Sequence, residues 1–453
     1  MKHLKTLTTV ALLAMAAQAT PPSESPYSIP QSPFYGQVRT RTEFDQKALA
    51  DTSVNKMLNS TQLRTRLGFV ATPSEKVEIK VEIQDLRFIG GEPSAAATSA
   101  PTATTGNMKG VDLLQGYIAV QEGPVKVALG RQKMQLGAGR FISTLEWSPT
   151  SRAFDGLSGN WSEGGGDLTA LAFLVRDTLN AAIDTGTGIG NVRATGVNDR
   201  EWLTGANYNY KFNDNFTAEV YGFYDQSRLK NIYSKDTLNH YDLAYVGGHV
   251  QGKAGLFAFD EEFIGQYGVA ARGPADATHM TSRAFQLALR AGITTPKIKA
   301  NLGLDVMSGD DDDTDKVTNL YRANYYFAHM YYGWMDYFGS NPKYGVMDYR
   351  ADVDALLLDW EGRTATFKGQ YHYFTPQNAP SGKDTFGNAK DAPYGQEIDA
   401  ELHLGLYPKS NIVLGAAMFM ADKNAYKLPV ARLKQGQNDN TGYFFYIMPT
   451  FNF

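Results

Sequence analysis

Three absences narrow the class of this protein. The 453 residues include no cysteine, which excludes disulfides, thiolate metal sites and cysteine nucleophiles. A net charge of −4 and a pI near 6.0 leave no basic footprint, so nucleic acid is not expected as a partner. Beyond the N-terminus there is no apolar run long enough for a transmembrane helix. An exported chain of this kind must be held together by backbone pairing or by a large core.

The first nineteen residues have the pattern of a secretory signal peptide. Lys2, His3 and Lys5 form a basic start, and 7–17 forms an apolar core of about 11 residues, too short to span a bilayer. The Ala17-Gln18-Ala19 sequence then fits the small-x-small pattern of a cleavage site. We expect residues 1–19 to be removed and the mature chain to begin near Thr20.

Patterning indicates the fold where composition does not. The mean hydropathy of −0.34 and the 20% charged residues fit a soluble protein, but also a barrel in which lipid-facing and lumen-facing residues alternate. An arm at 20–33 holds five prolines and is expected to be irregular. After it, segments of about ten residues alternate between apolar and polar positions, as strands with two different faces do.

About eighteen such segments follow one another to the last residue. Strands are predicted at 34–44, 61–71, 76–84, 112–121, 125–135, 153–162, 167–176, 201–212, 215–225, 241–252, 255–266, 282–293, 298–306, 349–359, 363–374, 397–406, 411–421 and 443–453. Short links such as 121–124, 212–215 and 294–296 alternate with long ones such as 177–199 and 308–348. This one-sided asymmetry is typical of outer-membrane barrels, whose short turns are periplasmic.

The last strand ends on aromatic residues, including Phe451 and the C-terminal Phe453. In this it resembles outer-membrane proteins generally, and the resemblance implies that the barrel-assembly machinery recognises Phe453. An open apolar edge in water would also invite aggregation. The sequence therefore predicts an all-β fold: a transmembrane antiparallel β-barrel of about 18 strands over 34–453, surrounded by outer-membrane lipid.

A barrel of this size encloses an aqueous channel, and the alternation predicts which side chains line it. The expected pore-lining residues are basic on early strands and acidic on late ones: Arg39, Arg41, Arg64, Arg66, Lys80, Asp352, Asp354, Glu397, Asp399 and Glu401. Two interpretations stay open. These walls can create a field that steers small polar or anionic solutes, or neighbouring strands can simply pair their charges.

The segment 129–157 carries the most specific motif. A strand ends in Gly130-Arg131-Gln132, a glycine-rich bend contains Gly139-Arg140, Trp147 follows, and Arg152-x-Phe154-Asp155-Gly156 opens the next strand. In these positions the chain resembles the alginate-export family of outer-membrane porins, except that Ala138 stands where that family is often acidic. The resemblance implies an 18-stranded, monomeric barrel in which this segment folds partly into the channel.

Charged and polar side chains of this segment form the expected inward-loop motif: Arg131, Gln132, Arg140, Glu146, Trp147, Arg152 and Asp155. Arginines and carboxylates here can pin the loop by charge-assisted hydrogen bonds, or they can contact the solute directly. Family resemblance does not identify the solute, although saccharides are among the candidates.

Other features suggest no further chemistry. The acidic run 310–315 lacks the glycine and closing glutamate of an EF-hand, and no metal or cofactor is expected. The aromatic stretch 321–349 fits either loop packing and an interfacial girdle or a saccharide platform. The histidines of the mature chain lie in no serine or metal motif. A porin is therefore the predicted function and enzyme activity is not expected; a plugged structural or adhesive barrel and an outer-membrane hydrolase are the alternatives.

Overall fold

The computed structural model describes residues 33–46, 58–89, 110–177, 200–230, 238–273, 276–312, 314–383, 389–422 and 441–453. The predicted signal peptide and nearly all of the proline-containing arm lie outside these ranges, so both remain predictions. Within the described ranges, no helix is long and apolar enough to cross a membrane.

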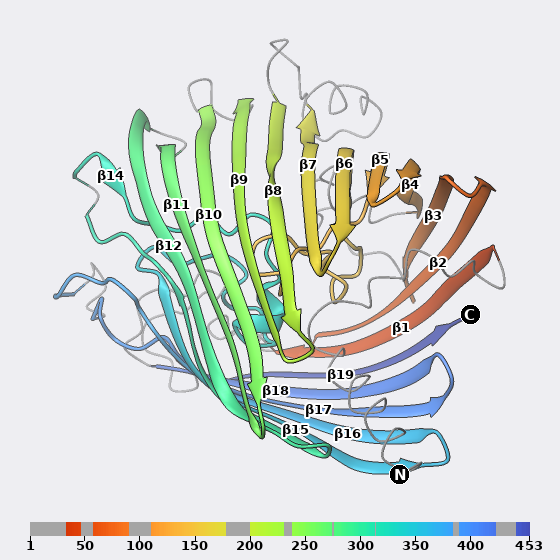
Figure 1. Ribbon diagram of the computed structural model, residues 1–453. Coiled ribbons are helices and arrows are strands. Elements are labelled where there is room, and N and C mark those ends of the chain that lie inside the picture. The colour runs from red at the N-terminus through yellow and green to blue at the C-terminus, as the bar shows by residue number, and fades with distance from the viewer. Residues whose placement is uncertain are drawn as a thin grey trace.

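Eighteen long antiparallel strands form one closed sheet (Figure 1). They are β1 (Phe34–Gln46), β2 (Leu58–Ser74), β3 (Val77–Phe88), β4 (Gly110–Glu122), β5 (Val125–Gln132), β6 (Phe154–Glu163), β7 (Gly166–Asp177), β8 (Arg200–Asn213), β9 (Phe216–Lys230), β10 (Leu238–Ala254), β11 (Phe257–Gly273), β12 (Asp276–Thr294), β13 (Ile298–Met307), β15 (Val346–Trp360), β16 (Arg363–Thr375), β17 (Gly395–Tyr407), β18 (Ser410–Ala421) and β19 (Thr441–Asn452). A two-residue strand, β14 (Val317–Thr318), pairs with β12, and the short helix α3 (Ala328–Tyr331) lies between β14 and β15.

Pairing between the first and last strands closes the barrel. Val38 lies opposite Phe451, and Gly36 exchanges two backbone hydrogen bonds with the C-terminal Phe453, at 3.1 and 3.0 Å. Figure 1 shows β1 beside β19 at this seam. Closure leaves no unpaired sheet edge, which hydrocarbon does not tolerate.

The alternation found in the sequence becomes an outer apolar wall. Side chains such as Leu302, Val246 and Val220 are 72, 60 and 59% exposed, whereas their polar neighbours on the same strands point into the lumen. Exposed aromatic residues form two belts on this wall, as expected at the two interfaces of a membrane. Near the tight turns lie Phe212, Phe257, Trp360, Tyr407 and Phe453, and toward the long connections lie Trp202, Tyr224, Tyr267, Tyr349 and Tyr371.

Tight turns join the strands at one end of the barrel. The turn between β15 and β16 contains only Glu361 and Gly362, both with positive φ (49° and 78°), the left-handed conformation that such short connections require. The long connections lie at the other end. If the barrel follows the general asymmetry of outer-membrane barrels, as the sequence predicts, its tight-turn end faces the periplasm.

Two of the long connections fold back inside the ring of strands (Figure 1). We call 133–153, between β5 and β6, the first inward segment and 319–345, between β14 and β15, the second inward segment. The buried apolar core lies around them, within the barrel, and joins Phe141 and Ile142 of the first segment to Tyr321 and Tyr332 of the second and to inner-wall residues such as Phe223. An eighteen-stranded barrel is too wide to be filled by its own wall side chains, so these segments supply the packing.

The predicted fold class is confirmed, and each of the eighteen predicted strands overlaps a long strand of the structure. The aromatic stretch at 321–349 mostly packs inside the barrel: Tyr325, Tyr331 and Trp334 are buried there. The interfacial girdle of that interpretation is wrong for residues 321–345, which form an inward segment, and holds only for Tyr349, which is exposed on β15.

We expect Leu302→Arg to destabilise the folded barrel by about 2–4 kcal/mol, the cost of an arginine facing lipid near the bilayer midplane. Asn301→Arg is the matched control, since Asn301 lines the interior cavity one residue away. Reversible denaturant unfolding in lipid vesicles measures both variants. Equal effects of the two would contradict the assigned faces of β13.

Candidate functional site: the constricted lumen

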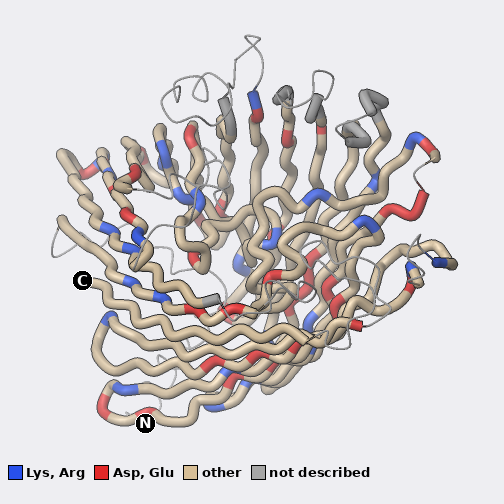
Figure 2. Tube along the Cα trace, turned by 180° about the vertical axis from the view of Figure 1, so that it is seen from behind, with Lys and Arg blue, Asp and Glu red and all other residues tan. Residues whose placement is uncertain are grey.

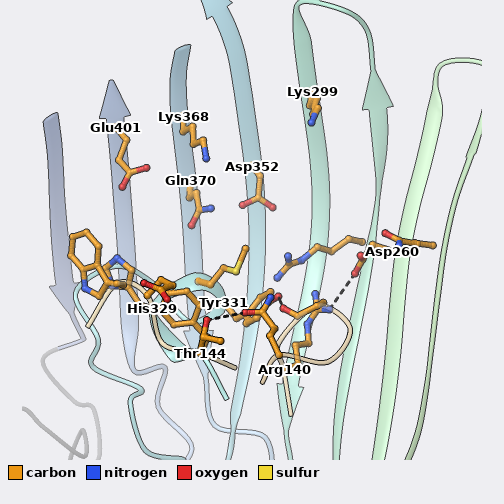
Figure 3. A pocket seen from close by; sticks show the side chains of 18 of the residues that line it. Arg140, Thr144, Asp260, Lys299, His329, Tyr331, Asp352, Lys368, Gln370 and Glu401 are labelled. Carbon is orange, nitrogen blue, oxygen red and sulfur yellow. Dashed lines mark hydrogen bonds and ion pairs between the residues drawn. The ribbon is translucent and has the colours of Figure 1, made fainter. Parts of the chain in front are cut away.

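The lumen holds a cavity of about 1490 Å³ between the tight-turn end and the inward segments. Its wall consists of inward side chains of both early and late strands, and its roof is formed by the two inward segments. Figure 3 shows how Lys299, Lys368, Asp352 and Glu401 project from neighbouring strands toward Arg140 and Tyr331 of the inward segments. We call this cavity the vestibule.

Basic side chains outnumber acidic ones in the vestibule. Its lining includes twelve Lys and Arg residues: Arg39, Arg64, Arg66, Lys80, Lys133, Arg140, Lys253, Arg290, Lys299, Arg350, Lys368 and Lys409. Its acidic residues are Glu146, Asp214, Asp260, Asp352 and Glu401. Figure 2 shows the uneven distribution along the chain, with basic positions on β1 and β2 beside the C-terminal strand and acidic positions gathered on late strands.

Arginines of the first two strands hold the first inward segment by its backbone. Arg39 donates hydrogen bonds to the carbonyl oxygens of Glu146 at 2.6 Å and Ser148 at 3.0 Å. Arg64 donates to the same two carbonyls at 3.1 and 3.2 Å, and Arg41 donates to the carbonyl of Trp147 between them. Three successive carbonyls, which no strand pairing could satisfy here, are thus satisfied by guanidinium groups.

The carboxylate of Glu146 adds an ionic anchor at the same place. It pairs with Arg66 at 2.8 Å, Lys133 at 3.2 Å and Arg64 at 3.4 Å. Burial alone would raise the pKa of Glu146, but the three neighbouring cations outweigh burial and hold it well below its usual range. The carboxylate is therefore ionised at neutral pH.

A second anchor joins the first inward segment to the opposite wall. Arg140, only 1% exposed, pairs with Glu262 at 3.0 Å and Asp260 at 3.2 Å on β11. Its guanidinium also lies 4.3 Å from the ring centre of Tyr331 in α3. Burial opposes the charge, but Tyr331 and the surrounding carboxylates raise the pKa of Arg140 well above its ordinary value.

The two inward segments are also tied to each other. Arg152 donates to the backbone carbonyl of Tyr325, and the Ser143 amide donates to the same carbonyl at 3.1 Å. Because Arg152 is buried without a carboxylate partner among these contacts, desolvation lowers its pKa to about 10. The contact places both segments in one layer across the lumen.

Acidic side chains of the barrel wall anchor the second inward segment. Tyr325 donates to Glu201 at 2.8 Å, and Asn324 donates to Asp225 at 2.9 Å. On the late strands, the Met335 amide donates to Glu397 at 2.8 Å. The arginines of β1 and β2 therefore hold carbonyl oxygens of the first segment, whereas these three carboxylates accept N–H and O–H donors of the second.

The predicted pore-lining residues lie in four different settings. Arg39, Arg64, Arg66, Lys80, Asp352 and Glu401 line the vestibule, whereas Arg41 lines a smaller cavity of about 440 Å³ beyond the inward segments, which we call the outer pocket. Asp354 lies half-buried on β15, opposite Lys299 and Lys368. Glu397 and Asp399 are almost fully buried beneath Trp334 and Met335.

The residues of the inward-loop motif also separate. Arg140, Glu146, Trp147 and Arg152 belong to the first inward segment, and Gln132 accepts a hydrogen bond from Ser158 at 2.6 Å. Arg131 and Asp155 instead pair with each other at 2.8 Å across β5 and β6. They share the parity of the exposed Leu129 and Leu157, so they face outward, and the expectation that they pin the loop is not what the structure shows. The period-two pattern Val127, Leu129, Arg131 already carried this signal.

Sequence reasoning missed part of the wall. Lys253, Lys299, Lys368 and Lys409 line the vestibule, and Asp260 and Glu262 receive Arg140. The predicted strand 298–306 contains Lys299, but nothing local distinguishes these positions from other lumen-facing charges.

We expect Arg140→Met to loosen the first inward segment, since removing one partner of a buried ion pair costs about 3–5 kcal/mol. Hydrogen–deuterium exchange of peptides covering 133–153 should accelerate by about tenfold or more. The exposed Arg87, paired with Asp85 on β3, supplies the control Arg87→Met, which should leave that exchange unchanged. Unaltered protection in Arg140→Met would show that the ion pairs do not anchor the segment.

The anchor at Glu146 should persist in mild acid. Its pKa in the folded protein lies below that of the unfolded chain, about 4.3, so its ion pairs contribute full stability above that pH and lose it only as the pH falls lower. Exchange of peptides covering 143–148, corrected for the intrinsic pH effect, should therefore be constant from pH 8 to 5. A loosening between pH 7 and 5 that Glu146→Gln abolishes would contradict the assignment.

Comparison with known proteins agrees with this architecture. The family model described as alginate export matches residues 31–419, whereas no protein with a curated description matches the chain. Among solved structures, Acinetobacter baumannii OccAB1 is similar with a TM-score of 0.58 at 13% identity, covering 93% of this chain and 96% of that one. Pseudomonas aeruginosa OpdL (0.56, 12%, 93% and 97%) and OccK8, or OprE (0.57, 11%, 93% and 98%), are similar to the same extent.

At these identities the solved structures show a shared fold and nothing finer. The family match is of a different kind, because it covers most of the sequence. The lumen-enclosing barrel with its two inward segments is thus an outer-membrane channel for small solutes, and the chain belongs to the alginate export family.

Proposed function

We propose that this channel passes small polar solutes and prefers anions. The observation that carries the proposal is the surplus of basic over acidic side chains around the vestibule, twelve against five. A pore with low-dielectric walls focuses the field of such charges and raises the local concentration of oppositely charged solutes.

Pairing between neighbouring strands offsets only part of this charge. Across β13, β15, β16 and β17 the register places Lys299, Asp354, Lys368 and Glu401 in one row of alternating sign. Lys253 and Lys409 add positive charge toward the tight-turn end. The lysines also differ in kind from the arginines of β1 and β2, whose guanidinium groups are engaged with the first inward segment.

Two structures of similar fold were solved with carboxylate-bearing molecules: Pseudomonas aeruginosa OpdK with vanillate (TM-score 0.51) and OccK2 in complex with glucuronate (TM-score 0.54). Their identities to this chain are 11 and 14%, so they illustrate what this barrel architecture can accommodate. The preference proposed for this chain rests on its own vestibule charges.

We expect chloride to be more permeant than potassium in planar bilayers, measured as a reversal potential under a salt gradient. In Lys253→Gln/Lys299→Gln, the ratio of the two permeabilities should fall by about two-fold, because two vestibule charges are lost. Lys76→Gln is the control, since Lys76 is exposed at a tight turn and pairs with Glu122 at 2.6 Å. Cation preference in the unaltered protein would overturn the proposed anion selectivity.

A further inference from the structure

Three aromatic side chains lie between the vestibule and the outer pocket. In the part of the chain that the structure describes, Trp147, Phe327 and His329 are the residues that line both cavities. Trp147 belongs to the first inward segment, and the other two belong to the second. The boundary between the cavities is therefore the place where the two inward segments meet.

The rings of Trp147 and His329 are in direct contact. Their centres are 3.9 Å apart and their planes differ by 9°, which is face-to-face stacking with no room for water between the rings. The guanidinium of Arg41 lies 4.1 Å from the Trp147 ring centre, and Tyr446 of β19 contacts the same ring edge-on at 4.8 Å. His329 Nδ1 lies 3.1 Å from an oxygen of Asp336.

The backbone on both sides of this contact is fixed. The carbonyl of Trp147 accepts hydrogen bonds from Arg39 and Arg41. On the other side, Arg350 donates to the carbonyl of Tyr331, at the end of α3, at 2.7 Å. The width of the passage at this point therefore depends on the side chains, because these hydrogen bonds hold the backbone of both segments.

From these contacts we propose that Trp147 and His329 form the constriction of the channel and set the size of the solute that crosses it. The inference rests on the proposed channel function and adds which residues limit passage. Removing either ring joins the vestibule to the outer pocket while leaving the backbone anchors in place. The charged lysines of the vestibule select by sign, and this ring pair selects by size.

Single-channel recording tests the proposal directly. Trp147→Ala and His329→Ala should each raise conductance by about two-fold or more, and should admit larger neutral solutes in liposome-swelling assays. His329→Phe keeps a stacked ring and should stay near the unaltered value. Met448→Ala is the matched control, because Met448 lines the vestibule only.

Because the chain contains no cysteine, single introduced cysteines supply a second test of where the constriction lies. Single cysteines are introduced as His329→Cys at the constriction, Asn301→Cys in the vestibule and Asn324→Cys in the outer pocket. A bulky charged thiol reagent should block current from either side at position 329. It should react at 301 only from the tight-turn side and at 324 only from the opposite side.

The outcomes separate the two proposals. In the first outcome, the unaltered protein conducts, Trp147→Ala and His329→Ala do not change its conductance, and a cysteine at position 301 reacts from both sides. That result overturns the constriction and leaves the proposed channel function standing. In the second outcome, current appears only in the alanine variants. That result supports the constriction and means that the two rings close the passage in the unaltered protein. Absence of current in every folded variant overturns both the constriction and the proposed function.

Discussion

Closure of the sheet is the constraint on which the remaining structure depends. In hydrocarbon every backbone N–H and C=O must find a partner within the protein, and here the pairing of β1 with β19 removes the last open edge. Closing eighteen strands produces a lumen too wide for wall side chains to fill. The inward segments fill part of this lumen, because they pack an apolar core inside the barrel and cover one end of the vestibule.

Polar contacts with the barrel wall hold both inward segments in the interior. Arginines on β1 and β2 satisfy carbonyl oxygens of the first inward segment, while carboxylates on β9, β8 and β17 accept N–H and O–H donors of the second. Charged groups buried in this way are stable only when they are paired or hydrogen-bonded. The uneven charge of the wall thus has a structural role beside the inward segments and, in the proposed function, an electrostatic role in the vestibule.

These two roles are performed by different residues at different depths. Arginines near the inward segments are occupied by backbone and carboxylate partners, whereas lysines closer to the tight turns surround the open volume of the vestibule. The difference suits the two side chains: a guanidinium presents several donors in a rigid plane, and an ammonium is a compact, hydrated charge on a flexible stem.

Much of this protein was determined by its sequence, because period-two alternation and link length are local properties. They located the eighteen strands and the lumen-facing side of β1 and β2, whereas the resemblance to the alginate-export family implied an inward loop carrying Arg140, Glu146 and Trp147. The alternation along β5 was also sufficient to place Arg131 on the outer face, although the sequence analysis assigned it to the inward-loop motif. Only the tertiary structure decided that Arg140 meets Asp260 and Glu262, that Glu397 and Asp399 lie under the second segment, and that Trp147 stacks on His329. Those pairs join residues 60 to 180 or so positions apart, whose meeting depends on the closed geometry of the whole barrel and leaves no local pattern in the chain.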